Sequence, residues 1–319
     1  MKLIVLSLLV VAALTSPLLI TEESTDYYKS TSSFQVYDHD KNPYKDWTIN
    51  EIKRFLLGTE LDTDIDREFF QDRTYSIKDY LSGIEADIPD SFDARTKWGS
   101  CIHPIRDQEQ CGSCWAFSAS EVLSDRFCIA SNKAVDVILG PEYQLSCDWW
   151  DHGCNGGIIS WAWSFLEKSG ECTDTCDPYT SGSGSVPWTC PSSCANESEA
   201  FMTYKAVRGS TKRFSDVATA KAEIMTNGPI QAGFSVYEDF MHYSGGVYEH
   251  KSGSLLGGHA VKIVGWGVEN NVEYWIVANS WNTTWGEQGF FKIKTGDCGI
   301  NDQLYAGLAD VQNAMAQIE

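Results

Sequence analysis

Apolar residues recur at helical spacing from Ser113 onward. The side chains that repeat every three or four positions are Ala116, Ala119, Leu123 and Phe127. This spacing places them on one face of a helix, and Ser113 stands where a capping hydroxyl is expected. The pattern therefore predicts a helix with Cys114 at its N-terminus, where the helix dipole favours a negative charge.

The last third of the chain has a different pattern, rich in β-branched and aromatic residues. Three such runs span residues 260–266, 272–278 and 289–294. Turn signals at residues 269–271 and 285–287 separate them, so the runs predict strands. We expect an α+β fold in which a helical lobe and a β lobe meet at a cleft.

The segment before residue 88 differs in composition from the rest of the chain. Residues 21–87 contain no cysteine and carry 16 acidic against 8 basic residues, a net charge of −8. Within it, residues 47–59 predict a short amphipathic helix. The residues of its apolar face are Ile52, Phe55 and Leu56, and its expected caps are Asn50 and Gly58. The run from Ile88 has the character of a new domain.

Residues 1–20 have a basic residue, Lys2, near their start and continue with a short apolar stretch and small residues. This order is typical of a cleaved secretory signal peptide, and the stretch is too short for a membrane span. No other segment approaches the length of a span. We expect a signal peptide over residues 1–16, a separate segment over 17–87 and one main domain over 88–319.

Composition narrows the class of protein. A hydrophobic fraction of 43% and an aromatic fraction of 13% indicate that the 319-residue chain is globular. A net charge of −20 argues against nucleic-acid binding, which needs a clustered basic face. It suits an acidic vesicle, where carboxylates repel one another less. Two sequons, at Asn196 and Asn282, would accept N-glycans in a secreted chain.

Eleven cysteines behind a secretory signal predict a disulfide framework with at least one free thiol. Cys114 is the natural candidate for that thiol. A zinc site is the alternative for paired cysteines such as Cys111 with Cys114 or Cys190 with Cys194. Secreted chains favour disulfides over such a site. We therefore expect no metal ion and no cofactor.

Three residues with complementary chemistry occur in the order Cys, His, Asn. Cys114 lies in the run Gln-Cys-Gly-Ser-Cys-Trp-Ala-Phe, and His259 and Asn279 follow far downstream. A neutral thiol attacks carbonyl carbon poorly, so a thiolate must form at working pH. His259 would take the thiol proton and return it to a leaving amine. Asn279 would hold the imidazole in orientation, and Trp281 would shield their hydrogen bond from water.

This constellation resembles the papain-type cysteine proteases, most closely the cathepsin B branch. The resemblance is carried by residues 89–95, 105–108, 123–126, 153–157 and 279–283. It implies a two-lobed papain-like fold and a proenzyme in which residues 17–87 are an inhibitory propeptide. It also implies that Gln108 and the Cys114 backbone N–H bind the oxyanion. The residues it assigns to substrate binding are Gly156, Gly157, Gly258, Ala260, Gln303 and Trp281.

The resemblance further implies four disulfides. They would pair Cys101 with Cys128, Cys111 with Cys154, Cys147 with Cys190, and Cys176 with Cys194. Cys172 and Cys298 are left over, and the sequence leaves open whether they pair or stay free.

The chain departs from the family pattern at several positions. Glu109 stands where the family has a glycine after the oxyanion glutamine, and Ile158-Ile159 replaces an aromatic residue and a proline. Gln303 replaces a pocket glutamate of cathepsin B, which predicts apolar or aromatic preference two residues before the scissile bond. The histidine-bearing occluding loop is missing, since no histidine lies between His152 and His242. We therefore expect an enzyme that acts mainly as an endopeptidase.

Other classes of function fit these residues less well. An inactive relative acting as a binding protein is disfavoured because Cys114, His259 and Asn279 are all present together with Gln108. A transglutaminase is disfavoured by the Gly-Ser-Cys-Trp context and the compact size. An active exopeptidase of the same family is the remaining alternative. We expect a monomer that acts on proteins or peptides in a lysosome, in a digestive vacuole or outside the cell.

Overall fold

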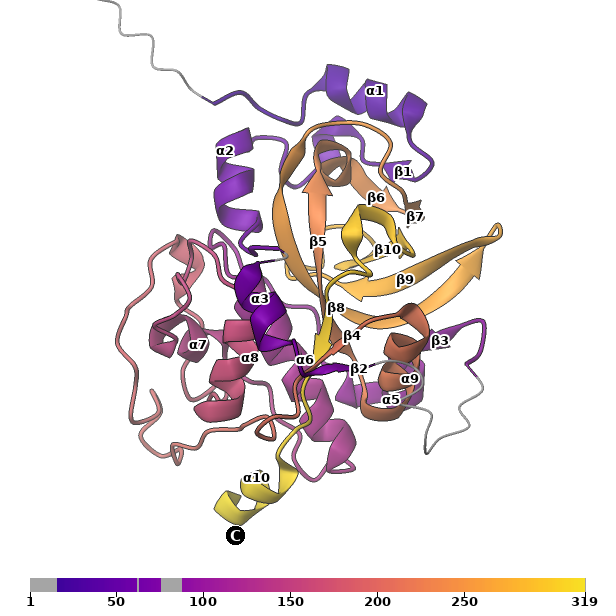
Figure 1. Cartoon of the computed structure of the whole chain (residues 1–319). Coiled ribbons are helices and arrows are strands. Elements are labelled where there is room, and N and C mark those ends of the chain that lie inside the picture. Colours follow the sequence, from indigo (N-terminus) through magenta and orange to yellow (C-terminus); the bar gives the residue numbers. More distant parts are fainter. Residues whose placement is uncertain (1–15, 62, 76–87, 319) are drawn as a thin grey trace, which may run out of the picture.

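The computed structural model describes residues 16–61, 63–75 and 88–318, and Figure 1 shows their arrangement. The predicted signal peptide, apart from Ser16, lies outside the described residues, as do residues 76–87 at the end of the predicted propeptide. The described residues form two lobes, with an N-terminal segment laid across both (Figure 1). Within these residues, no helix is both long and apolar enough to cross a membrane.

The helical lobe is built around α6 (Cys114–Ala130), which is buried along almost its whole length. Against it pack α7 (Pro141–Cys147) and α8 (Ile159–Lys168). The predicted helix start is confirmed, but the predicted cap is wrong. Ser113 lies outside the extended conformation that a capping residue adopts, with ψ of 16°, and its hydroxyl donates to the Cys111 carbonyl instead.

The β lobe is a mixed sheet with strand order β2-β4-β11-β5-β8-β9-β10-β7, and β3 pairs with β8. Its strands are β2 (Thr74–Tyr75), β3 (Phe92–Asp93), β4 (Lys212–Phe214), β5 (Ile230–Tyr237), β7 (Val247–Tyr248), β8 (Leu255–Glu269), β9 (Val272–Ala278), β10 (Phe290–Lys294) and β11 (Leu304–Ala306). The three predicted strands are β8, β9 and β10, and β8 begins earlier than predicted because its first residues pair with β5. Between β8 and β9, Asn270 and Asn271 take positive φ values, which suit a tight hairpin turn.

Buried polar contacts join the two lobes. Gln231 on β5 donates to the Trp115 carbonyl of α6 at 3.0 Å, and Trp163 on α8 donates to the Gln231 side chain at 2.7 Å. Arg126 on α6 donates to the carbonyls of Pro229 and Gly307. Helix α6 also packs directly on β8. The main domain also contains the helices α5 (Ala94–Trp98), α9 (Val217–Asn227) and α10 (Val311–Ile318).

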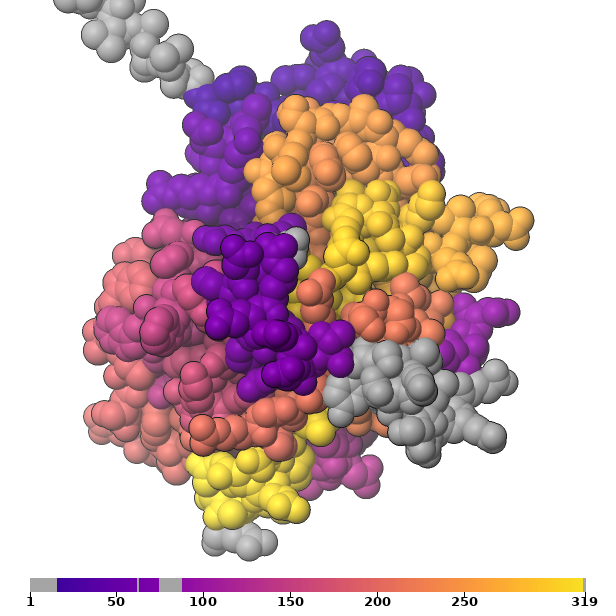
Figure 2. Space-filling view, in the orientation of Figure 1, coloured from indigo at the N-terminus to yellow at the C-terminus, as the bar shows by residue number. Residues whose placement is uncertain are grey.

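The N-terminal segment runs from the β lobe, through the junction of the lobes, to the helical lobe (Figure 2). Its elements are α1 (Glu22–Thr31), β1 (Gln35–Val36), which pairs with β6 (Tyr243–Gly245), α2 (Ile49–Glu51), a π-helical turn (Ile52–Leu56) and α3 (Asp64–Phe69). The prediction that Asn50 caps the start of this helix is wrong. The Thr48 hydroxyl accepts the Glu51 N–H while the Glu51 carboxylate accepts the Thr48 N–H, which satisfies two backbone donors at once. The helix ends before Gly58, at an extended Leu57.

Four disulfides cross-link the main domain. They are the four pairs that the resemblance implies: Cys101–Cys128, Cys111–Cys154, Cys147–Cys190 and Cys176–Cys194. Cys114, Cys172 and Cys298 are free thiols. The open question about Cys172 and Cys298 is therefore answered in this structure, where they do not pair.

Candidate active site

Cys114 is the first residue of α6 and is fully buried. Its sulfur lies 3.2 Å from the hydroxyl of Thr59, a residue of the N-terminal segment. Burial raises the pKa of the Cys114 thiol, and hydrogen bonds from Thr59 and from the backbone of Ala260 only partly offset this effect. The thiol is therefore held neutral while Thr59 covers it.

His259 lies on β8, directly before Ala260, whose backbone hydrogen-bonds the Cys114 sulfur. Its Nε2 and the Asn279 side-chain oxygen are 2.7 Å apart, while its Nδ1 has no hydrogen-bond partner among the described residues. The Trp281 ring lies 4.7 Å from the imidazole, measured between centroids, and is itself buried. Burial lowers the pKa of His259 to about 4. The structure thus joins His259 to Asn279, but the Cys114 sulfur contacts Thr59 and makes no hydrogen bond with Nδ1.

Gln108 is buried beside Cys114 in a network that holds its amide in one orientation. Its side-chain oxygen accepts the Ser280 hydroxyl at 2.7 Å. Its Nε2 donates to the carbonyls of Cys111 and Phe55, each at 2.9 Å. Phe55 belongs to the N-terminal segment, so a carbonyl of that segment already occupies the donor predicted to bind an oxyanion.

Glu109 takes the backbone conformation that explains the family preference for glycine at this position. Its φ is +52°, a left-handed value that is costly for most residues with a side chain. The Asp107 carboxylate accepts the Glu109 N–H at 2.8 Å and helps to hold this turn. The departure from the family pattern is therefore tolerated without displacing Gln108.

The N-terminal segment lies between the two lobes as an extended strand. Gly157 exchanges two backbone hydrogen bonds with it, donating to the Gly58 carbonyl at 2.8 Å and accepting the Glu60 N–H at 3.1 Å. On the opposite side, the Gly258 carbonyl accepts the N–H groups of Gly58 and Thr59. A Cβ at Gly156 would lie 3.1 Å from the Gly58 carbonyl oxygen, and one at Gly258 would clash with the Thr59 carbonyl oxygen, so these two glycines allow a peptide backbone to approach from both lobes. A Cβ at Gly157 would instead meet the Trp115 ring of the main domain.

Leu61 of the same segment fills a pocket next to this strand. The positions of Leu61, Ile159 and Gln303 converge on Gly233, where a Cβ would lie 2.8 to 3.3 Å from their side chains. Gln303 is nearly inaccessible to solvent, and its side-chain oxygen has no hydrogen-bond partner among the described residues. Ala260 is fully buried and contacts the Cys114 sulfur through its backbone. The pocket is therefore mainly apolar, with one polar group.

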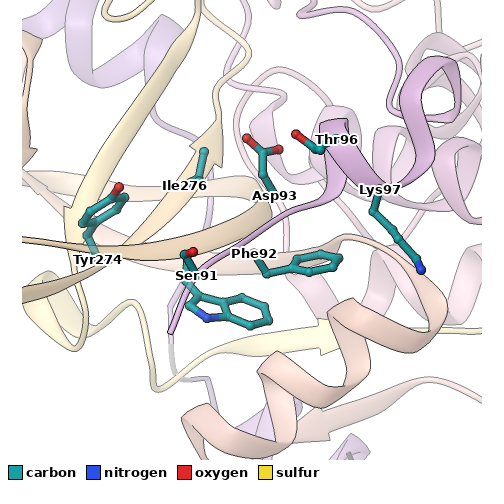
Figure 3. A pocket seen from close by; sticks show the side chains of 8 residues that line it. Ser91, Phe92, Asp93, Thr96, Lys97, Tyr274 and Ile276 are labelled. Atoms are coloured by element: carbon teal, nitrogen blue, oxygen red, sulfur yellow. The ribbon is translucent and has the colours of Figure 1, made fainter. Parts of the chain in front are cut away.

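A cavity of about 300 Å³ lies next to Trp281. Asp107, Glu109 and Asn282 line it from the main domain, and Tyr44 and Trp47 line it from the N-terminal segment. The lining residues include no histidine. A second cavity of about 550 Å³, drawn in Figure 3, lies around Phe92 and Trp266, and none of the predicted site residues lines it.

Two further sequence predictions concern the surface. Asn196 and Asn282 are both exposed, and the Asn282 side chain donates to the Asp107 carboxylate at 3.0 Å. Among the described residues, Cys176, Cys194 and Glu199 come close enough together to suggest metal ligands. The sulfurs of that pair are joined in a disulfide, so they cannot act as thiolate ligands.

Comparison with known proteins agrees with this geometry. The chain belongs to the papain family of cysteine proteases, whose family model, described as "Papain family cysteine protease", matches residues 88–308. Cathepsin B-like cysteine proteinase 4 of Caenorhabditis elegans is 40% identical over 348 residues, covering 98% of this chain and 100% of that protein. Cathepsin B-like CP2 of Giardia intestinalis is 44% identical, covering 70% and 75% respectively.

A solved structure shares the architecture over nearly the whole chain. It is the procathepsin B S9 of Trypanosoma congolense, with a TM-score of 0.82 and 30% sequence identity, covering 92% of this chain and all of that one. The predicted papain-like fold and cysteine-type peptidase class are thereby confirmed. No local pattern in the sequence points to two residues of the N-terminal segment, Thr59 and Asp66. Each is defined by a partner far away along the chain: Thr59 contacts Cys114, and Asp66 accepts the Ser160 N–H.

Proposed function

We propose that this cysteine protease hydrolyses peptide bonds through Cys114 and His259, with Asn279 orienting the imidazole. The thiolate sulfur attacks the scissile carbonyl carbon, and Gln108 with the Cys114 N–H stabilises the resulting oxyanion. His259 gives its proton to the leaving amine, which leaves a thioester on Cys114. It then takes a proton from water, which attacks the thioester and releases the acid product.

We also propose that the described chain is the latent proenzyme, with residues 17–87 as propeptide. The observation that supports this best is the N-terminal segment in the cleft: Thr59 covers the Cys114 sulfur, and Phe55 occupies Gln108. Together with the buried imidazole, this arrangement keeps both reacting groups neutral. Removal of the segment would admit water and allow the thiolate–imidazolium pair to form.

Processing is tested on the whole secreted chain. After acidification, the wild type should shorten by about 70 residues and gain activity on peptide substrates. The Cys114→Ala variant should remain full-length under the same conditions. A wild-type chain that stays full-length and inactive would favour the alternative of an inactive binding protein.

The side of the cleft near Trp281 supports an endopeptidase rather than an exopeptidase. Asp107 and Glu109 line the cavity there, and their carboxylates would repel the free C-terminal carboxylate of a short substrate. The region between Cys176 and Cys194 lacks the histidines that would attract it. A peptide that continues past the scissile bond, with no charge at this point, meets no such repulsion.

The test compares one peptide with a free C-terminus against the same peptide amidated. The amidated form should be cleaved at least as fast, and Glu109→Gln should narrow the difference. Glu197→Gln, an exposed carboxylate that does not line the cavity, is the matched control. If a free carboxylate sped dipeptide release by about tenfold, the exopeptidase alternative would replace this proposal.

The chemistry suits the secretory pathway, with a lysosome, a digestive vacuole or the extracellular space as the place of action. Four disulfides and the predicted signal peptide agree with an oxidising route of export. Fractionation of the native host, with antibody against residues 88–319, would locate the processed form.

A further inference from the structure

Helix α8 begins without a cap from its own sequence. Ile158 occupies the N-cap position and has no side chain that accepts a hydrogen bond, and the first turn contains no acidic residue. An uncapped helix start leaves several backbone N–H groups without intrahelical partners. Partners from elsewhere must therefore satisfy the donors at the start of α8.

A carboxylate of the N-terminal segment provides one of these partners. Asp66, on α3, accepts the Ser160 N–H at 3.0 Å, and its other oxygen accepts the Thr63 hydroxyl at 2.9 Å. Asp66 is almost completely buried at this contact. The start of α8 thus already holds an anion, and the anion belongs to the part of the chain that processing would remove.

A second polar group at the same turn has no partner. Ser160 is fully buried, and its hydroxyl makes no hydrogen bond to any described residue. When α3 leaves, the Ser160 N–H loses its partner, and the hydroxyl of the same residue has none to begin with. A buried donor pair of this kind at a helix start binds an anion readily.

Two neighbouring carboxyl groups do not cancel this preference. Asp151 accepts the Ile158 N–H at 2.7 Å, and Asp148 lies beside it. Burial raises the pKa of Asp148 to about 6, and burial together with Asp148 raises the pKa of Asp151 to about 9. Below pH 6 both groups are mostly protonated in this structure, and a protonated carboxyl group repels an incoming carboxylate little.

The position of Asp66 relates this site to the cleft. Along the segment, Thr59 contacts Cys114, Leu61 fills the pocket beside Ile159, and Asp66 reaches the next residue of α8, Ser160. Five residue steps separate Leu61 from Asp66, and the last three follow the start of α3. Even if the other two steps were fully extended, the separation would be at most about 11 Å. An extended substrate covers that length in about three residues.

We propose that the processed enzyme has a carboxylate-binding subsite at the start of α8, formed by the N–H and hydroxyl of Ser160. Its ligand is an aspartate or glutamate side chain of the substrate, third to fifth before the scissile bond, on the far side of the Leu61 pocket from Cys114. Asp66 occupies the N–H of this subsite in the proenzyme, and the hydroxyl has no hydrogen-bond partner there. The inference rests on the proposed protease function and adds a substrate class to it.

The experiment uses the processed wild-type enzyme and matched peptides that differ only by glutamate or glutamine at each of these three positions, with leucine for the pocket. At one position, kcat/KM for glutamate should exceed that for glutamine by about tenfold, the usual scale for a charged hydrogen bond at a helix start. A ratio below about two at all three positions would overturn the proposal.

Two variants locate the effect. Ser160→Pro removes the N–H at a first-turn position, so the glutamate-to-glutamine ratio should fall to about one. Ser160→Ala keeps the N–H and should retain most of the ratio, and an unchanged ratio in Ser160→Pro would refute the assignment. If neither peptide were cleaved, the protease function itself would fail. The affinities of the two labelled peptides, measured by fluorescence anisotropy, would still test the subsite.

Discussion

Replacing His242 by phenylalanine should make release of the N-terminal segment less sensitive to acid. His242 ends the 3-10 helix Glu238–His242 and is fully buried. The ring of Tyr28, on α1, lies 4.6 Å from the imidazole, and neither ring nitrogen has a hydrogen-bond partner among the described residues. Phenylalanine keeps the ring contact but cannot take up a proton.

The magnitude follows from the pKa of this imidazole. Burial lowers the pKa of His242 from 6.5 to about 4, while Asp239 opposes the shift and His39 adds to it. The docked segment therefore excludes a proton that a free imidazole binds. Burial of neutral His242 therefore costs docking nothing above pH 6.5, an increasing amount as the pH falls from 6.5 toward 4, and no additional amount below about 4. The difference between these two pKa values corresponds to at most about 3 kcal/mol, since the β lobe itself supplies part of the burial.

The assay uses full-length chains in a Cys114→Ala background, which cannot process themselves. A trace of processed wild-type enzyme is added, and removal of the N-terminal segment is followed by intact mass. The quantity compared is a ratio: the rate for the chain that keeps His242 divided by the rate for the His242→Phe chain. Taking this ratio cancels the pH dependence of the added enzyme. This ratio should be about one near pH 7 and rise about tenfold or more near pH 4.

The matched control is His152→Gln, since His152 is exposed and lies outside this interface. The rate for the parent chain divided by the rate for the His152→Gln chain should be independent of pH. An equally flat ratio for His242→Phe would show that protonation of His242 does not weaken docking. Other groups would then have to explain any acid sensitivity of docking.

Three further predictions concern the site and its scaffold. His259→Ala should abolish peptide hydrolysis nearly as completely as loss of the thiol, whereas Asn279→Ala should lower kcat less, because only the orientation of the imidazole is lost. Steady-state kinetics of the two variants tests this, and equal losses of kcat would contradict the assigned roles. Gln303→Glu should raise kcat/KM for arginine relative to leucine in the Leu61 pocket by up to the roughly 1–3 kcal/mol that one contact discriminates, and no gain would remove Gln303 from the pocket. Arg126→Met leaves the buried Glu223 carboxylate unpaired and should lower the free energy of unfolding by about 3–5 kcal/mol in urea titrations, so a change below about 1 kcal/mol would contradict the structural role of this pair.

Local patterns predicted the elements that carry the site. The helix at Cys114 and the strands next to His259 and Asn279 follow from apolar spacing and turn residues, and the structure has them; β8 begins early enough to include His259, and Asn279 directly follows β9. Local patterns also misplaced the two caps. Asn50 and Ser113 have suitable side chains, but a capping box at Thr48 and a non-extended backbone at Ser113 decide otherwise.

Contacts across long stretches of sequence were beyond such reasoning. Thr59 meets Cys114 across 55 positions, and Asp66 meets Ser160 across 94. Neither residue stands out by type, because threonine and aspartate are common in any acidic segment. What gives them a role is the path of the N-terminal segment through the cleft, which depends on the packed structure of both lobes.

The central claim is that Cys114 is a nucleophile that the N-terminal segment covers. The most direct measurement treats the chain before and after acidification with an epoxide inhibitor of papain-like enzymes and locates the adduct by peptide mass spectrometry. Cys172 and Cys298, the other free thiols, are internal controls. We expect one adduct, on Cys114, in the processed form only, with a loss of activity in proportion to the modified fraction. Full activity with Cys114 modified, or inactivation with the adduct on Cys172 or Cys298, would contradict it.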